Sequence, residues 1–204
     1  EIGQIAGRAG RYKNDGTFSY IKGARSLDPL IVQSIEDHEF DNIQKIYWRN
    51  FNIDFSSINS VINSLKKFPT KNYLIHKKNA DDEINFRTLS KDSEIASYLN
   101  NSKFISLLWD ICCIPDFQKI FNDLYINLLK NIFLTIVNNN GILPESWLQE
   151  RILRLENYKG GIEELSLKIA TIRTWTYISN QSSWIKDQQF WQEKTHKIEN
   201  NLSD

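Results

Sequence analysis

The sequence predicts a mainly α-helical protein. Apolar residues recur at the helical spacing i, i+3 and i+4 over most of the chain after residue 54. Residues that favour helix starts, such as serine, aspartate and proline, precede several of these stretches, and asparagine or glycine follows them. The chain has 204 residues, of which 41% are hydrophobic and 25% charged. These values are ordinary for a globular protein and suffice for one helical domain or two small ones.

Before residue 54 the expected elements are short. Residues 2–12 are expected to form a helix, Asp15 and Gly16 a turn, and residues 17–21 a short strand, because they are β-branched and aromatic. A second helix is expected at 29–38, with Asp28 as its cap and Pro29 at its first position. Residues 43–53 are expected to form a strand or an extended connector.

From residue 54 onward the pattern is helical. Residues 54–57 supply caps for a helix that carries apolar residues at 58, 61, 62 and 65, and a basic linker is expected at 66–79. Further helices are expected at about 80–90, 92–100, 103–113, 117–137, 144–157, 162–179 and 187–202. The helix after Pro115 keeps its apolar pattern over five turns and is expected to be the core of the domain. In the helix at 162–179, the expected inward stripe consists of Ile162, Leu165, Ile169, Ile172 and Thr176.

Composition limits the classes of function. The net charge is zero, with 25 basic and 25 acidic residues, so any contact with nucleic acid must come from a local patch. No apolar run approaches the ~20 residues that span a bilayer, and the polar first residues predict no signal peptide. The two cysteines are adjacent, at 112 and 113, and are interpreted as core residues of a protein from a reducing compartment. The three histidines lack metal-ligand spacing, so no metal site is predicted.

The first residues carry a pair of arginines framed by glycines. Residues 4–11 read Gln-Ile-Ala-Gly-Arg-Ala-Gly-Arg, which places Arg8 and Arg11 three positions apart. On a helix these two lie on one face and can present two guanidinium groups side by side. Guanidinium binds phosphate oxygens through two hydrogen bonds, so the pattern predicts a phosphate contact. The alternative interpretation is a solvated basic helix start.

This octet resembles motif VI of superfamily 2 helicases, Gln-x-x-Gly-Arg-x-Gly-Arg, at every fixed position. Further segments, in the same order, are similar to bacterial relatives of the mitochondrial degradosome RNA helicase; they are residues 16–18, 28–29, 35–41, 48–50, 53–57, 114–117 and 172–177. The resemblance implies that 1–27 is the end of a second RecA-like α/β lobe, that 28–53 is a connector and that 54–204 is a helical accessory domain.

The resemblance also implies an activity. Arg11 would be the arginine finger toward the γ-phosphate of ATP, Arg8 a neighbouring phosphate contact, and Gln4, Gly7 and Gly10 residues of the nucleotide cleft. The complete protein would use ATP and Mg²⁺ to unwind RNA, and some duplex DNA, and to feed an exoribonuclease. It would lie in the bacterial cytoplasm, or in mitochondria if eukaryotic. The sequence holds no Walker A motif, no acidic helicase box and no methionine. We therefore expect a C-terminal fragment that needs a missing N-terminal RecA-like lobe and does not hydrolyse ATP alone.

Two segments are candidates for RNA binding. The linker at 66–79 mixes basic and aromatic residues, which suits phosphate neutralisation and base stacking. Its candidate contacts are Lys66, Lys67, Lys71, Tyr73, Lys77 and Lys78. The alternative interpretation is a solvated basic loop. Arg173 and Trp175 form the second candidate, for which packing of the tryptophan against a neighbouring helix is the alternative.

A second hypothesis for the whole chain belongs to another class of function. The chain would be a helical module that docks a protein or RNA, and the arginine motif would be a remnant without motor activity.

Overall fold

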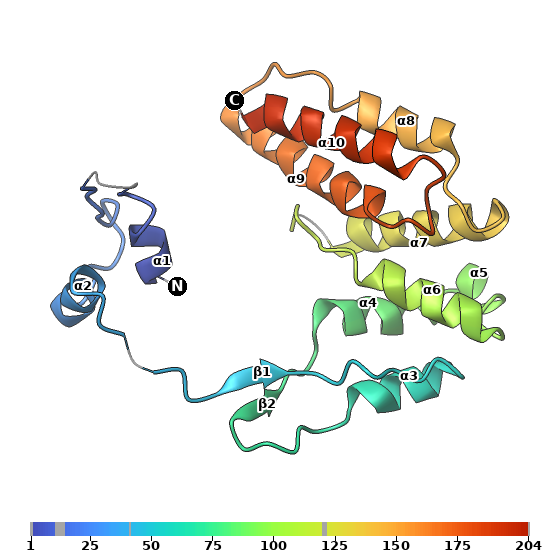
Figure 1. The fold of residues 1–204 in the computed structure, drawn as a ribbon, viewed down its shortest axis with the longest axis horizontal. Coiled ribbons are helices and arrows are strands. Elements are labelled where there is room, and N and C mark those ends of the chain that lie inside the picture. The colour runs from blue at the N-terminus through green and yellow to red at the C-terminus, as the bar shows by residue number, and fades with distance from the viewer. Residues whose placement is uncertain (1, 11–14, 41, 120–121, 204) are drawn as a thin grey trace. The chain divides into compact units, whose positions relative to one another are not determined.

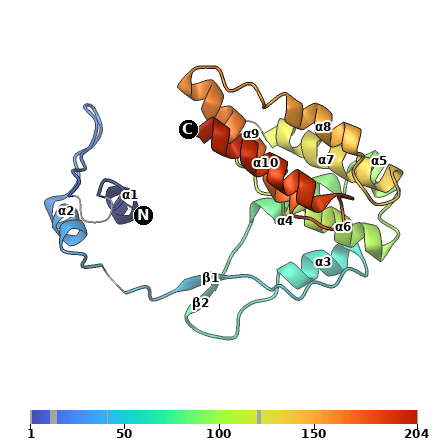
Figure 2. The same cartoon turned by 45° about the horizontal axis from the view of Figure 1, so that its top comes forward.

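The computed structural model describes residues 2–10, 15–40, 42–119 and 122–203 (Figures 1 and 2). The fold is mainly helical, as predicted. The chain divides into two compact units, Glu1–Ile46 and Tyr47–Asp204. The boundary between the units falls inside the predicted connector.

Two helices, α1 (Ile2–Ala6) and α2 (Pro29–Glu36), belong to the first unit. The start of α2 is the predicted one, because the Asp28 side chain accepts a hydrogen bond of 2.9 Å from the Leu30 N–H and Pro29 follows it. The prediction for α1 was too long. Residues 7–10 form turns instead of helix, and the glycines at 7 and 10 give a physical reason, since glycine lowers helix stability by about 1 kcal/mol relative to alanine.

The predicted strand at 17–21 is wrong. The described residues 15–21 have no regular structure, so the turn predicted at Asp15 and Gly16 is wrong as well. The turn lies further on, where the Ala24 N–H donates to the Ile21 carbonyl and Gly23 has a φ of +92°. A short β-branched run becomes a strand only when a neighbouring strand pairs with it, and the described part of the first unit offers none.

The second unit begins with a two-stranded ribbon and a helix. Strand β1 (Ile46–Trp48) crosses the unit boundary and pairs with β2 (Leu74–His76), which lies beside it in both views (Figures 1 and 2). Between them in sequence lies α3 (Ile58–Leu65), whose predicted cap Ser57 accepts a hydrogen bond from the Ser60 N–H. Strand β2 falls within the predicted linker. Its three residues are too few to show the alternating pattern by which a strand is recognised in a sequence.

The remaining helices cover one continuous core. They are α4 (Asp81–Leu89), α5 (Ser93–Ala96), α6 (Ser102–Cys112), α7 (Asn122–Asn138), α8 (Glu145–Leu153), α9 (Ile162–Ser179) and α10 (Gln188–Ser203). Their buried apolar side chains form one cluster with those of α3, from Val61 to Leu202. Helices α9 and α10 pack along each other (Figure 1). In the described part of the chain, no helix is both long and apolar enough to cross a bilayer.

Helix α7 supplies the centre of this core, as predicted. Leu129, Ile132, Phe133 and Ile136 are each at most 1% exposed. The predicted start near Phe117 is wrong, because residues 115–119 are irregular; the Asp116 carboxylate accepts hydrogen bonds from the backbone N–H groups of the two residues that follow Phe117. Residues 120 and 121, also predicted to lie in this helix, fall outside the described residues. The helix ends where Asn140 and Gly141 adopt positive φ angles.

The other helices follow the predictions to different degrees. Helix α9 has the predicted bounds, and the predicted stripe is correct in part. Ile172 is buried and Leu165 and Ile169 pack against the core, but Ile162 is 85% exposed. The buried side also includes Thr174, Trp175 and Ile178, which the stripe left out. Helix α5 covers only four residues of the predicted 92–100, and α8 ends at residue 153 rather than 157.

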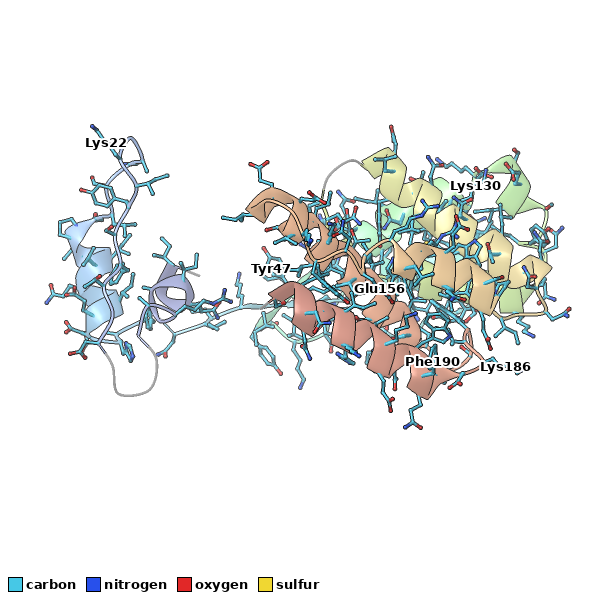
Figure 3. The ribbon with its side chains drawn as sticks, turned by 90° about the horizontal axis from the view of Figure 1, so that it is seen from above. Lys22, Tyr47, Lys130, Glu156, Lys186 and Phe190 are labelled. Carbon is cyan, nitrogen blue, oxygen red and sulfur yellow. The ribbon has the colours of Figure 1, made fainter. Side chains whose placement is uncertain are left out.

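One ion pair fixes α5 against α7. Lys130, on α7 (Figure 3), donates to Asp92 at 2.8 Å and to Glu94 at 2.7 Å, and the Asp92 carboxylate also caps α5. The hydrogen bond from Lys130 holds the pKa of Asp92 below its ordinary value of 3.8. A lowered folded-state pKa stabilises the protein above the ordinary value, and that stabilisation is lost as the pH falls through the folded-state pKa.

Replacing Asp92 with asparagine is therefore expected to lower the melting temperature by a few degrees at most at neutral pH. The difference from the wild type should shrink as the pH falls below 3.8 toward the lower folded-state pKa of Asp92, because the wild-type carboxylate then becomes neutral too. Thermal unfolding over a range of pH measures this. The control is Asp187→Asn, whose carboxylate caps α10 without an ion pair in the described part of the chain. A difference that stays constant down to pH 2 would contradict the assignment.

Candidate nucleic-acid interface

The described part of the arginine motif spans the end of α1 and the turn that continues it. The Gly7 N–H donates to the Gly3 carbonyl at 2.9 Å, as in an α-helix, and the Arg8 N–H then donates to the Ile5 carbonyl at 3.2 Å, which is a tighter turn. The side chains of Gln4 and Arg8 are exposed. The prediction that Arg8 lies on a helix face is wrong, because the helix ends at residue 6. Arg11 lies outside the described residues.

Glycines allow the chain to pass close to this turn. A Cβ atom at Gly16 would lie 2.2 Å from the Ala9 carbonyl carbon and 2.4 Å from the Gly10 nitrogen. Side chains cannot be accommodated at that distance from backbone atoms, so the backbone at position 16 requires glycine. A Cβ atom at Gly7 would lie 3.3 Å from the Gly3 carbonyl oxygen. The backbone at residue 16 thus passes directly against the two residues that follow Arg8.

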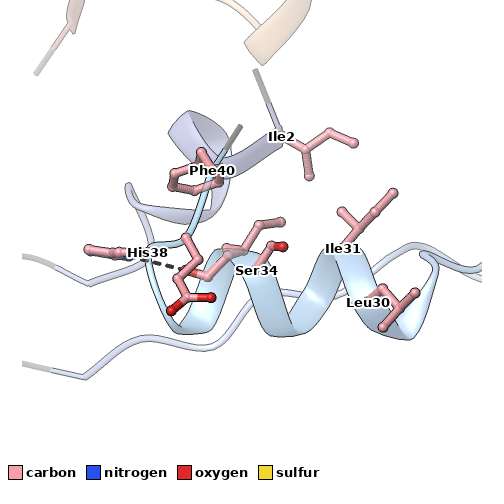
Figure 4. Close-up of a pocket in the computed structure, with 9 residues that line it drawn as sticks. Ile2, Leu30, Ile31, Ser34, His38 and Phe40 are labelled. Carbon is pink, nitrogen blue, oxygen red and sulfur yellow. Dashed lines mark hydrogen bonds between the residues drawn. The ribbon is translucent and has the colours of Figure 1, made fainter. Parts of the chain in front are cut away.

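A shallow pocket lies between α1 and α2 (Figure 4). Its walls mix apolar residues, among them Ile2, Leu30 and Phe40, with the polar side chains of Ser34 and Glu39. The Nδ1–H of His38, at its rim, donates to the Ile35 carbonyl at 3.1 Å. Neither Gln4 nor Arg8 lines this pocket, and no lysine or arginine is among those of its lining residues that the structure describes. The described lining therefore offers no cationic side chain to a phosphate.

A strongly basic segment begins at the boundary between the two units and continues into the second. Residues 45–78 hold seven of the 25 basic residues and one of the 25 acidic residues, a net charge of +6 that the rest of the chain balances with −6. The side chains of Lys66, Lys67, Lys71, Lys77 and Lys78, all predicted from the sequence, are exposed. A local positive patch thus exists within a chain of zero net charge.

Strand pairing divides this segment into two faces. Exposure alternates along it: Tyr73, Ile75 and Lys77 are exposed, whereas Leu74 and His76 are half-buried, as expected when successive strand residues point to opposite sides. On the covered side the His76 Nε2–H donates to the Leu65 carbonyl at 2.8 Å, and the Phe68 ring lies 5.1 Å from the imidazole. This side holds the ribbon against α3.

On the other side, which we call the outer face, two tyrosines lie next to lysines. The face consists of Tyr47, Lys71, Tyr73, Ile75 and Lys77. The Lys77 ammonium lies 5.2 Å from the centre of the Tyr47 ring, and the Lys71 ammonium lies 5.6 Å from that of Tyr73. Tyr47 is 70% exposed and Tyr73 is 49% exposed. The sequence analysis did not find Tyr47 (labelled in Figure 3), because only strand pairing brings it next to Lys77.

The second predicted RNA contact is corrected by the structure. Trp175 is only 4% exposed and packs edge-on against Trp147, with ring centres 5.8 Å apart. It cannot stack on a base, so the alternative of packing between helices holds. Arg173 is exposed but donates to Glu199 at 2.9 Å, an ion pair between α9 and α10.

An ion pair anchors the ribbon to the helices. The Arg49 guanidinium, directly after β1, donates to both carboxylate oxygens of Asp82 on α4 and lies 5.4 Å from the Trp109 ring centre on α6. This hydrogen bonding raises the pKa of Arg49 above its ordinary value. The exposed fractions of the Arg49 and Asp82 side chains are 23% and 19%. Each charge has lost much of its hydration, and the other charge compensates for that loss.

Replacing Asp82 with alanine is expected to lower the free energy of unfolding by about 2–3 kcal/mol, because the half-buried Arg49 then has no partner. Chemical denaturation followed by circular dichroism measures the loss. The matched control is Asp81→Ala, which removes an exposed neighbouring carboxylate and should cost less than about 1 kcal/mol. The double variant Arg49→Met, Asp82→Leu should recover much of the stability. A loss for Asp82→Ala no larger than that of the control would refute the anchoring role.

The adjacent cysteines lie next to this anchor. Cys112 is buried, and the Cys113 Sγ lies 4.0 Å from an Asp82 carboxylate oxygen. Burial raises the pKa of the Cys113 thiol to about 12. A thiol that stays protonated at neutral pH is a poor nucleophile, so both cysteines act as packing residues. Among the residues described, no group of three or more His, Cys, Asp or Glu side chains is arranged to hold a metal ion.

Comparisons of the chain with protein-family models, with curated proteins and with solved structures found no match.

Proposed function

We propose that this chain is the C-terminal part of an ATP-dependent RNA helicase of superfamily 2. In this proposal Arg11 and Arg8 contact the phosphates of ATP held by a preceding RecA-like lobe, with Gln4, Gly7 and Gly10 beside them. Mg²⁺ accompanies the nucleotide, and the helical unit guides the RNA strand. An exoribonuclease partner, and a location in the bacterial cytoplasm or in mitochondria, belong to the proposal through the same resemblance.

The observation that carries the proposal is the exposure of the described polar side chains of residues 4–11. These side chains, Gln4 and Arg8, are exposed four residues apart on a chain that still turns like a helix. Arg8 has no ion-pair or hydrogen-bond partner for its side chain among the described residues, so its guanidinium donors are available to a phosphate.

The two units suit different parts of this function. The first offers arginine donors but no phosphate-binding loop, and the second carries a basic face. Each part of a helicase cycle needs one of these: transition-state charge on the transferred phosphate is stabilised by arginine, and a bound strand is held by lysines and aromatic rings.

Turnover of ATP tests the proposal. The assay uses the protein that carries these residues together with a nucleotide-binding lobe, in the presence of RNA. Replacing Arg8 or Arg11 with alanine should abolish most of the turnover and leave the fold intact, whereas Arg25→Ala, an exposed arginine outside the octet, should leave turnover unchanged. Full turnover in both octet variants would refute the proposal.

A second candidate function is an RNA-docking module without motor activity. It is favoured by one observation, namely that the basic outer face belongs to a unit with its own continuous hydrophobic core. This candidate predicts RNA binding by the chain that survives replacement of both Arg8 and Arg11, and no ATP turnover that depends on these two arginines. Loss of turnover in the arginine variants would exclude it.

A further inference from the structure

We propose that the outer face of the β1–β2 ribbon is a binding site for a nucleic-acid single strand. Tyr47 and Tyr73 would stack on bases, and Lys77 and Lys71 would contact the phosphates next to them. The inference rests on the strand-guiding role in the proposed function, but not on the ATPase role of Arg8 and Arg11.

Exposure indicates that the face has an occupant. Two aromatic rings and Ile75, which is 39% exposed, are presented to solvent within one short ribbon. Large apolar side chains grouped on a surface are typical of interaction sites. The ribbon has other exposed aromatic neighbours in sequence, Phe51 and Phe68, at 81% and 72% exposure.

Charge indicates the class of occupant. The segment that forms the ribbon and its connections has a net charge of +6, and its single acidic residue, Asp54, is not part of the outer face. A polyanion gains from such a patch through the release of its counterions, even when the whole protein is neutral. The pairing of each tyrosine with one lysine fits a polymer that offers an aromatic ring and a phosphate in every unit.

The arrangement favours a single strand over a duplex. Tyrosine rings can stack only on bases whose faces are free, and in a duplex those faces are covered by the neighbouring base pairs. The lysines lie over the ring faces in the free protein, at 5.2 and 5.6 Å. A phosphate attracts the ammonium groups more strongly than a ring does, so a strand that binds can uncover the rings for its bases.

Two contacts on the covered side and at the end of β1 hold the backbone of the ribbon in place. His76 is tied to the Leu65 carbonyl, and Arg49 ties the end of β1 to Asp82. Neither side chain belongs to the outer face. The tyrosines therefore project from a ribbon whose backbone is held in place before a strand arrives, which lowers the entropy lost on binding.

Fluorescence anisotropy with the full chain tests the site. The probes are a labelled RNA single strand of about 12 nucleotides and mixed sequence, the same strand as DNA, and the same RNA annealed to its complement. Each is titrated at several salt concentrations. The variants are Tyr47→Ala with Tyr73→Ala, and Lys71→Gln with Lys77→Gln. The matched control is Tyr158→Ala with Lys91→Gln. Both side chains are exposed, Tyr158 to 40%, and both lie outside the ribbon.

The tyrosine variant and the lysine variant should change different properties of binding, namely its affinity and its salt dependence. Loss of both tyrosines should weaken single-strand binding about 30-fold or more, the equivalent of about 1 kcal/mol for each ring, without changing the salt dependence. Loss of both lysines should reduce the slope of log K against log salt by about 1.4, because each phosphate contact to a single strand contributes about 0.7. The control variant should bind like the wild type, and the duplex should bind more weakly than the single strand.

Three results would overturn the proposal: no binding of the single strands at low salt, a duplex that binds as tightly as the single strand, or tyrosine variants that bind like the wild type. The last result, even beside a lysine effect, would mean electrostatic attraction without base stacking. Unchanged circular dichroism and melting temperature in every variant exclude misfolding as the cause of a loss. Because the arginine test is read as ATP turnover, failure of the ribbon and failure of the helicase assignment give different results.

Discussion

Under the proposed function, replacing Arg11 with alanine is expected to lower the RNA-stimulated turnover of ATP by roughly 10³- to 10⁵-fold. An arginine finger acts on the charge that develops in the transition state, so kcat should fall far more than KM rises. Lysine at the same position should restore little, since it lacks the planar pair of donors that guanidinium offers to phosphate. The measurement is steady-state ATP hydrolysis by the protein that carries both lobes.

Two comparisons make this result specific. Arg8→Ala should reduce turnover as well, while the exposed Arg25 outside the octet serves as the neutral control. Binding of a single strand to the ribbon should persist in all three variants. If Arg11→Ala keeps more than a tenth of the wild-type turnover, Arg11 is not the finger, and the octet must have another role.

Replacing Phe133 with alanine is expected to lower the free energy of unfolding by about 3–5 kcal/mol. The side chain is 0% exposed at the centre of α7 and meets the Tyr98 ring edge-on, with ring centres 6.1 Å apart. Its removal leaves a cavity in the core, around which the structure relaxes only in part. Urea denaturation followed by helical circular dichroism should show a lower midpoint with an unchanged slope.

The control for this variant is Phe51→Ala, a phenylalanine that is 81% exposed. Its loss should change the stability by no more than about 0.5 kcal/mol. A cost below about 1 kcal/mol for Phe133→Ala would mean that α7 is not the centre of the core.

Elements specified by neighbouring residues could be predicted from the sequence. The bounds of α9 and the caps at Asp28 and Ser57 follow from local capping and from helical periodicity. Two predictions of strands were wrong because strands depend on distant residues: a strand was predicted at 17–21 and is absent, and the three-residue β2 was not predicted. Whether a short apolar run becomes a strand depends on a partner elsewhere in the chain, and β1 and β2 are separated by 25 residues that include α3.

The candidate sites show the same division. The lysines of 66–79 could be predicted because charge alone keeps them at the surface. The sequence could not decide whether Trp175 stacks on a base or packs against a neighbouring helix, because its burial depends on Trp147 from another helix. Tyr47 was missed because its role depends on Lys77, thirty positions further on. Sequence spacing reports which side of one element a residue occupies, but not what a second element brings to it.

The opposite charges of residues 45–78 and of the rest of the chain also govern how the protein behaves in solution. With a pI near 7.1, copies of the chain carry no net repulsion at neutral pH. The positive segment of one molecule then attracts the acidic remainder of another, so solubility should rise as salt is added rather than fall. Such a protein can be retained by a cation-exchange resin at the pH where its net charge is zero, because the resin binds the local positive patch whatever the net charge of the whole chain.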